Sequence, residues 1–133
     1  MVQYSLEELQ SLAKQLSLSA KTGDIFLLHG DLGAGKTTFA QAFIQVRYPG
    51  TVVTSPTFSI CQEYEDVVHY DLYRINAFEE LNELDIQEHF HHKICLVEWP
   101  EILGLLTPKK ALHIHIAQGA TRDTRVINCL VAN

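Results

Sequence analysis

A glycine-rich octet carries the strongest chemical signal in this sequence. Residues 30–37 read Gly-Asp-Leu-Gly-Ala-Gly-Lys-Thr, which matches the pattern G-x-x-x-x-G-K-[ST]. Glycines at this spacing let successive backbone N–H groups turn toward a phosphate, and the positive end of a following helix favours the same anion. In this pattern Lys36 reaches the β- and γ-phosphates, and the Thr37 hydroxyl binds Mg²⁺. The octet predicts nucleoside triphosphate binding, with contacts from Asp31, Leu32, Gly33, Ala34, Gly35, Lys36, Thr37 and Thr38.

Two acidic residues lie at the ends of predicted strands. Hydrolysis needs groups that hold the metal and orient water, and these groups usually come from the ends of neighbouring strands. Glu98 ends the run Ile-Cys-Leu-Val-Glu, and we expect it to hold Mg²⁺ together with Thr37. Asp71 ends another run and is expected to bind the metal or to orient the attacking water. The alternatives are a solvated acid for Glu98 and a structural salt bridge with Arg74 for Asp71.

A third candidate lies on a short loop. Thr57 follows Ser55-Pro56, a turn signal, and a loop there is placed to approach the γ-phosphate. Switch segments of this kind become ordered only when triphosphate is bound. We therefore add Thr57 to the catalytic candidates Lys36, Asp71 and Glu98.

The elements that must position these side chains follow from the hydrophobic pattern. Apolar residues recur at helical spacing after the Ser5–Glu8 capping box and again from Lys36 to about Arg47, so both segments are expected to be helices. The stretch 77–92 is expected to form one or two acidic helical turns. Strands are expected at 25–29, 51–53, 59–64, 67–72, 94–98, 112–117 and 125–131. The last two strands should form a hairpin.

Together these elements predict an α/β fold of the P-loop NTPase type. We expect three layers, with a central mixed sheet that has a parallel core and antiparallel edge strands. The length of 133 residues favours a single domain spanning 1–133.

Composition and charge narrow the choice of partners. The formal net charge is −6, and nine of the sixteen acids fall between Glu63 and Glu88. This balance argues against direct binding to a phosphate backbone, which needs clustered cations. No amino-terminal export signal and no apolar run long enough to span a membrane is present in the sequence. We therefore expect a cytoplasmic protein without a membrane partner.

Histidines and an aromatic residue offer weaker signals. Among His89, His91 and His92, only the first and last have helical spacing, so a metal site is not favoured there. His113 and His115 alternate with apolar residues, which predicts a solvent-facing or partner-facing role. Trp99 follows Glu98 and is interpreted as a packing residue that could form a wall of the site.

Four segments in this order resemble the TsaE family, formerly called YjeE. They are the octet with Thr38, then Ser-Pro-Thr-Phe at 55–58, His-Tyr-Asp-Leu-Tyr-Arg at 69–74, and Glu-Trp-Pro-Glu at 98–101. The family consists of small P-loop ATPases of bacterial tRNA threonylcarbamoyladenosine synthesis. The resemblance covers nearly the whole chain and is far more specific than the octet alone.

The resemblance implies a slow, Mg²⁺-dependent ATPase that acts with the TsaD–TsaB complex. That complex transfers the threonylcarbamoyl group to adenosine 37 of tRNA, so contact with tRNA would be indirect, through the complex. By resemblance, Thr37 and Glu98 hold Mg²⁺, Asp71 supports hydrolysis, and Thr57 belongs to a switch-like loop. The family also contacts the nucleotide near positions that correspond here to Ser5 and Arg122.

Two other functions share the same loop. A small-molecule or nucleotide kinase usually needs a lid and several arginines, whereas this chain has four arginines and little length for a lid. A GTP-dependent switch needs a guanine-reading motif such as N-K-x-D, which the sequence lacks. The kinase therefore remains the alternative, and ATP is favoured over GTP.

Overall fold

The computed structural model describes residues 2–53 and 60–131. Their strands, in chain order, are β1 (Gln3–Ser5), β2 (Ile25–His29), β3 (Cys61–Glu63), β4 (Val67–Asp71), β5 (Ile94–Glu98), β6 (Leu112–Gln118) and β7 (Thr124–Val131). The helices are α1 (Leu6–Ser19), α2 (Lys36–Arg47) and α3 (Ile86–His92), with 3₁₀ segments η1 (Phe78–Leu84) and η2 (Pro100–Leu106). None of the helices in these two ranges is both long and apolar enough to cross a bilayer.

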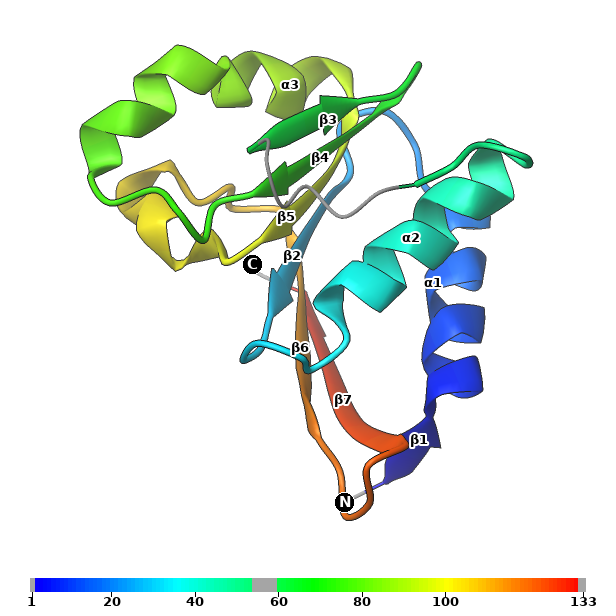
Figure 1. The fold of residues 1–133 in the computed structure, drawn as a ribbon. Coiled ribbons are helices and arrows are strands. Elements are labelled where there is room, and N and C mark those ends of the chain that lie inside the picture. Colours follow the sequence, from blue (N-terminus) through cyan, green and yellow to red (C-terminus); the bar gives the residue numbers. More distant parts are fainter. Residues whose placement is uncertain (1, 54–59, 132–133) are drawn as a thin grey trace.

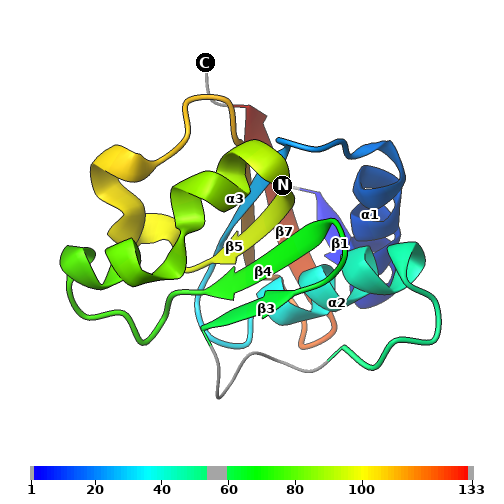
Figure 2. The same cartoon turned by 90° about the horizontal axis from the view of Figure 1, so that it is seen from above.

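The strands form one seven-stranded mixed sheet in the order β1-β7-β6-β2-β5-β4-β3. The inner strands β6, β2, β5 and β4 are parallel, whereas β7, β1 and β3 join antiparallel. Figures 1 and 2 show α1 and α2 covering one face, with η1, α3 and η2 on the other. The expected three-layer α/β fold with a parallel core and antiparallel edges is confirmed.

The core consists of two apolar clusters, one on each face of the sheet. Alternate residues of β2 serve both, because Phe26 and Leu28 belong to the cluster with α1 and α2, and Ile25 and Leu27 to the other. A strand covered on both faces needs an unbroken apolar run, and this is the run that the sequence displays. Its position between β5 and β6 places the loop after His29 at the centre of the sheet's carboxyl edge.

The expected elements agree with the structure except at the edges of the fold. The strand expected at 51–53 is wrong, because these residues have no regular structure. Part of the strand expected at 59–64 lies outside the described residues, and its described part forms the shorter β3. The pattern also missed β1, a three-residue edge strand paired with β7, since three residues are too few to show a period.

Candidate functional site

The glycine-rich loop, residues 30–37, connects β2 to α2. Gly30 packs against β6 so closely that a Cβ there would collide with the carbonyl oxygen of Ile116. Gly35 is the N-cap of α2 with φ 121°, in the region that favours glycine. Ala34 is buried, whereas Asp31, Leu32 and Gly33 are exposed at the crown of the loop. The loop therefore presents backbone N–H groups at a helix amino terminus, the arrangement that suits an anion.

Lys36 is held at this loop by its surroundings. Its Nζ contacts the Gly30 carbonyl oxygen, lies 3.5 Å from the Asp31 carbonyl oxygen, and sits 3.4 Å from the centroid of the Trp99 ring. The residue is 4% exposed. Burial lowers the pKa of Lys36, while nearby carboxylates, Glu98 first among them, raise it. The structure thus places a desolvated ammonium group at the mouth of the glycine-rich loop.

Thr37 and Glu98 meet beside Lys36. The Thr37 hydroxyl donates to Glu98 Oε1 at 3.1 Å, and it lies 3.4 Å from Oε2. Glu98 is 2% exposed at the end of β5, and its Oε2 lies 2.7 Å from Nε2 of the fully buried His69. A hydroxyl and a carboxylate are hard oxygen donors of the kind that Mg²⁺ prefers. The residues expected to hold Mg²⁺ are therefore adjacent, and the pair fits that ion.

Asp71 lies on the strand next to Glu98. In the parallel pairing of β4 with β5, Asp71 is the register partner of Glu98, so both side chains are on the α2 face. Its Oδ1 accepts a 3.0 Å hydrogen bond from the Tyr73 backbone N–H. Burial raises the pKa of Asp71, and the Tyr73 hydrogen bond partly opposes that rise. No ion pair to Arg74 is found within the described ranges, so the salt-bridge alternative has no support.

Arg125 of β7 holds the glycine-rich loop through hydrogen bonds to its backbone carbonyl oxygens. Its Nε donates to the Ala34 carbonyl oxygen at 2.6 Å, and its Nη2 donates to that of Gly33 at 3.4 Å. Its Nη1 donates to the carbonyl oxygens of Arg122 and Thr124 at 2.7 and 2.8 Å. The guanidinium group is thus a rigid fork between the loop and the β6–β7 hairpin.

The remaining candidates are only partly placed. Ser5 is the N-cap of α1, where it forms the expected capping box with Glu8, and it pairs in register with Thr124 of β7. Arg122 is exposed in the β6–β7 connection, two residues before Thr124. Their contact with nucleotide stays a prediction. Thr57 lies outside the described residues, so its expected role in a switch-like loop is not tested.

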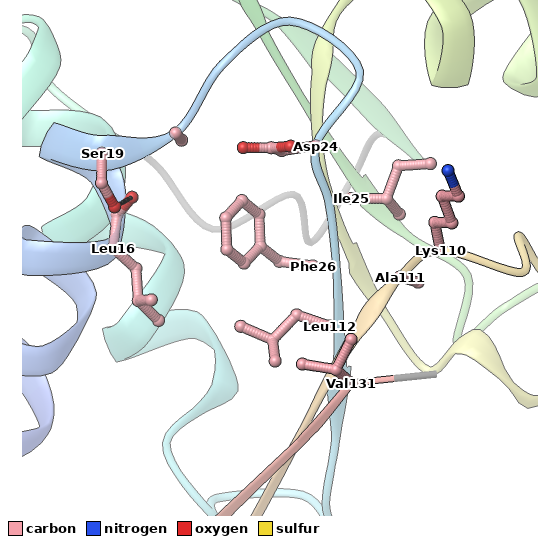
Figure 3. A pocket seen from close by; sticks show the side chains of 10 residues that line it. Leu16, Ser19, Asp24, Ile25, Phe26, Lys110, Ala111, Leu112 and Val131 are labelled. Carbon is pink, nitrogen blue, oxygen red and sulfur yellow. Dashed lines mark hydrogen bonds between the residues drawn. The ribbon is translucent and has the colours of Figure 1, made fainter. Parts of the chain in front are cut away.

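Two cavities differ in chemistry and position. One of about 310 Å³ opens at the carboxyl ends of β2 and β6 and is lined in part by Gly30, Asp31 and His115. The other, of about 520 Å³, lies at the opposite end of β2, between α1 and the sheet. Figure 3 shows Leu16, Phe26, Leu112 and Val131 around this second cavity, which has a mostly apolar lining. It is remote from the glycine-rich loop and lacks that loop's phosphate-binding pattern.

Two residues of the site, His69 and Arg125, were not selected from the sequence. His69 lies two residues before Asp71 on the same strand, and strand alternation places both on one face, so this signal was available. Arg125 is 91 residues from Ala34 in the sequence, and no local pattern connects them. Trp99, interpreted as a packing residue that could form a wall of the site, has its ring over the Lys36 ammonium group.

Comparisons with known proteins show which family the chain is similar to. The family model described as threonylcarbamoyl adenosine biosynthesis protein TsaE matches residues 3–127. The TsaE protein of Bacillus subtilis is 38% identical over 132 residues, which cover 96% of this chain and 82% of that protein. The TsaE protein of Rickettsia conorii is 46% identical over 110 residues, and the match covers 78% of this chain but only 63% of that protein.

A solved structure shares the fold over almost the full length. The crystal structure of YdiB from Bacillus subtilis superposes with a TM-score of 0.77 at 31% sequence identity, and the match covers 99% of this chain and 86% of that one. The family model, the sequence relatives and this structure all lead to one conclusion. The chain belongs to the TsaE family.

Proposed function

We propose that this chain binds ATP with Mg²⁺ at the glycine-rich loop and hydrolyses it slowly. The observation that carries the proposal is the meeting of Lys36, Thr37 and Glu98 at the carboxyl edge of the parallel sheet. A backbone cradle, a desolvated cation and two hard oxygen ligands are the components that phosphoryl transfer needs.

Each side chain has a role that follows from its position. Lys36 leaves the Gly30 and Asp31 carbonyl oxygens to bind the β- and γ-phosphate oxygens when a triphosphate enters. Thr37 and Glu98 hold Mg²⁺, which supplies charge neutralisation to the phosphates when bound. His69 fixes the orientation of Glu98 from the buried side. We propose that Asp71, whose pKa is raised by burial, accepts a hydrogen bond from the attacking water.

We infer that this ATPase serves threonylcarbamoyladenosine modification of tRNA. The relatives from Bacillus subtilis and Rickettsia conorii are named as tRNA threonylcarbamoyladenosine biosynthesis proteins. The proposed partner is the TsaD–TsaB complex, and contact with tRNA is indirect. The net charge of −6 supports this arrangement, because a protein that does not bind tRNA directly needs no basic surface.

The acidic segment, residues 63–88, is the proposed docking surface for the partner complex. Some of its acids interact within the chain. Asp66 forms an ion pair with Arg47, and Glu80 accepts hydrogen bonds from backbone N–H groups at the start of η1. Glu79 and Glu83 are exposed and have no ion pair among the described residues. Exposed acids of this kind speed docking to a more basic partner.

The test is ATP hydrolysis by the purified protein, alone and with the matching TsaD–TsaB pair. Lys36→Ala is the blank, and a Glu79→Lys/Glu83→Lys variant tests the docking surface. A slow basal rate that changes when the pair is added supports the proposal. A rate indifferent to the pair, with phosphorylated product from a small acceptor, would instead establish the kinase alternative.

A further inference from the structure

Three histidine side chains meet on the sheet face opposite Glu98. His29 is the last residue of β2, and His113 and His115 alternate along β6. The register pairs Leu27 with His113 and His29 with His115, so all three imidazoles project from the same face. The ring centroid of His29 lies 4.2 Å from that of His115 and 5.1 Å from that of His113. Each histidine offers one ring nitrogen, and these three nitrogens all lie within 4.8 Å of one another.

A carboxylate sets the orientation of the central ring. Glu101 Oε1 lies 3.4 Å from His29 Nδ1, which favours the tautomer with its proton on Nδ1. His29 Nε2 then carries a lone pair, and it lies 2.9 Å from His113 Nδ1. A histidine that binds a metal ion usually donates its other ring N–H to a carboxylate or a carbonyl group in this way.

The surroundings of His29 favour its neutral imidazole, which is the form that binds metal. Burial lowers the pKa of His29, and the neighbouring His115 and His113 lower it further, while Glu101 opposes them. His29 is 20% exposed, so its ring is shielded yet still within reach of an entering ion. The cavity of about 310 Å³ borders His29, His115 and Asn128 and gives access to solvent.

We propose that His29, His113 and His115 form a binding site for a divalent transition-metal cation of the Zn²⁺, Co²⁺ or Ni²⁺ class. Imidazole is a preferred ligand of these ions, whereas Mg²⁺ prefers oxygen donors. Nitrogen ligands bind Zn²⁺ at about 2.0–2.1 Å. Small side-chain rotations therefore bring the three nitrogens onto a common ion, and the hydrogen bond between His29 and His113 gives way to two metal bonds. Water from the cavity fills the fourth position.

This site is separate from the proposed Mg²⁺ site. Leu28, not His29, is the register partner of Glu98, so the sheet itself stands between the two ligand sets. The two sites also differ in donor chemistry, since one offers three nitrogens and the other a hydroxyl and a carboxylate. Excess Mg²⁺ therefore leaves the histidine cluster available.

The experiment is metal titration of the protein without a histidine tag and without nucleotide, in excess Mg²⁺. Zn²⁺ binding is measured by calorimetry, and Co²⁺ binding by its visible absorption bands. We expect one equivalent to bind, and His113→Ala and His115→Ala each to weaken binding about tenfold or more, because each removes one of three ligands. His91→Ala and His92→Ala are matched controls on α3 and should bind like the wild type.

A second measurement locates the ion without any substitution. Co²⁺ or Ni²⁺ added to the unmodified chain should broaden the NMR signals of the His29, His113 and His115 rings before those of His91 and His92. Absence of stoichiometric binding would overturn the proposal. So would equal affinity in the cluster variants and the controls, or broadening that begins at His91 and His92.

Discussion

The Thr37 hydroxyl lies 3.1 Å from Glu98 Oε1, although 61 residues separate them in the chain. Thr37 lies in the first turn of α2, and Glu98 ends β5, the strand beside β2. Because parallel strands end at the same edge of the sheet, the last residue of one strand meets the helix that follows the neighbouring strand. This one contact defines where the proposed Mg²⁺ binds.

Replacing Glu98 should affect hydrolysis more than nucleotide affinity. In Glu98→Gln the shape and the hydrogen bonding to Thr37 are largely kept, but the negative charge that holds Mg²⁺ is lost. We expect kcat for ATP hydrolysis to fall on the order of 10²–10³-fold, as when a transition-state stabilising group is removed, with a small change in ATP affinity. Steady-state hydrolysis and equilibrium titration with a fluorescent ATP analogue measure the two effects. Glu88→Gln on α3 is the control, and equal hydrolysis by Glu98→Gln and wild type would contradict the assignment.

Lys36→Ala should abolish productive triphosphate binding. The ammonium group is the cation at the mouth of the glycine-rich loop, and alanine leaves the phosphate charge without it. We expect ATP affinity to fall by about 10²-fold, which corresponds to about 2.7 kcal/mol. Calorimetry with a non-hydrolysable analogue measures this loss. Lys109→Ala, at an exposed lysine, should retain wild-type affinity, and a Lys36→Ala protein that binds as well as that control would refute the role of Lys36.

Removing His69 should destabilise the fold and misplace Glu98. His69→Ala leaves the buried Glu98 Oε2 without its 2.7 Å partner. A buried polar group that loses its partner costs about 1–3 kcal/mol, so the free energy of unfolding should fall by about that amount. Urea denaturation provides the measurement. His92→Ala removes a histidine from an exposed pair with Glu88 and should leave the stability unchanged, so an equal response of the two variants would count against the buried pair.

Arg125→Lys should weaken nucleotide binding without removing charge. Lysine cannot donate simultaneously to the loop carbonyls of Ala34 and Gly33 and to the hairpin carbonyls. The loop then loses its support, and we expect KM for ATP to rise about tenfold, equivalent to about 1.4 kcal/mol, with less change in kcat. Arg74→Lys, at an exposed site, serves as the control. A fall in kcat at constant KM would show that Arg125 acts on chemistry and not on loop position.

Asp71→Asn should stabilise the nucleotide-free protein at neutral pH while it lowers hydrolysis. Burial raises the pKa of Asp71 in the folded state, so between the unfolded value of about 3.9 and the folded value the native protein holds more protons. Stability from this group is therefore complete below the unfolded pKa and is lost as pH rises through the folded pKa.

Asparagine carries no such ionisation and still accepts from the Tyr73 N–H. The melting temperature of Asp71→Asn should exceed that of wild type at pH 7, and the difference should shrink as the pH approaches about 4. Thermal melts at several pH values measure it. Asp123→Asn, in the exposed hairpin, should show no such trend, and a constant difference for Asp71→Asn across pH would contradict the prediction.

Much of the fold was predictable because its central elements leave strong local patterns. The run from Ile25 to Leu28 is apolar because β2 is covered on both faces, and the octet that follows matches a fixed pattern of residue types at fixed spacing. The edge elements were less predictable. The three-residue β1 exists because β7 offers free backbone groups, and the expected strand at 51–53 has no pairing partner among the described strands.

The candidate site also has residues that the sequence predicts and contacts that only the tertiary structure shows. Lys36, Thr37, Asp71 and Glu98 could be selected from the sequence, because phosphate chemistry restricts residue type and spacing within each short segment. That Thr37 touches Glu98, that Arg125 supports the loop and that His29 joins His113 and His115 are decided by strand order and register. These contacts join segments that are tens of residues apart in the chain. Local sequence patterns do not predict which strands become neighbours in the sheet. The sequence by itself determined the chemistry that each segment carries, and only the packing of the sheet decided which groups act together.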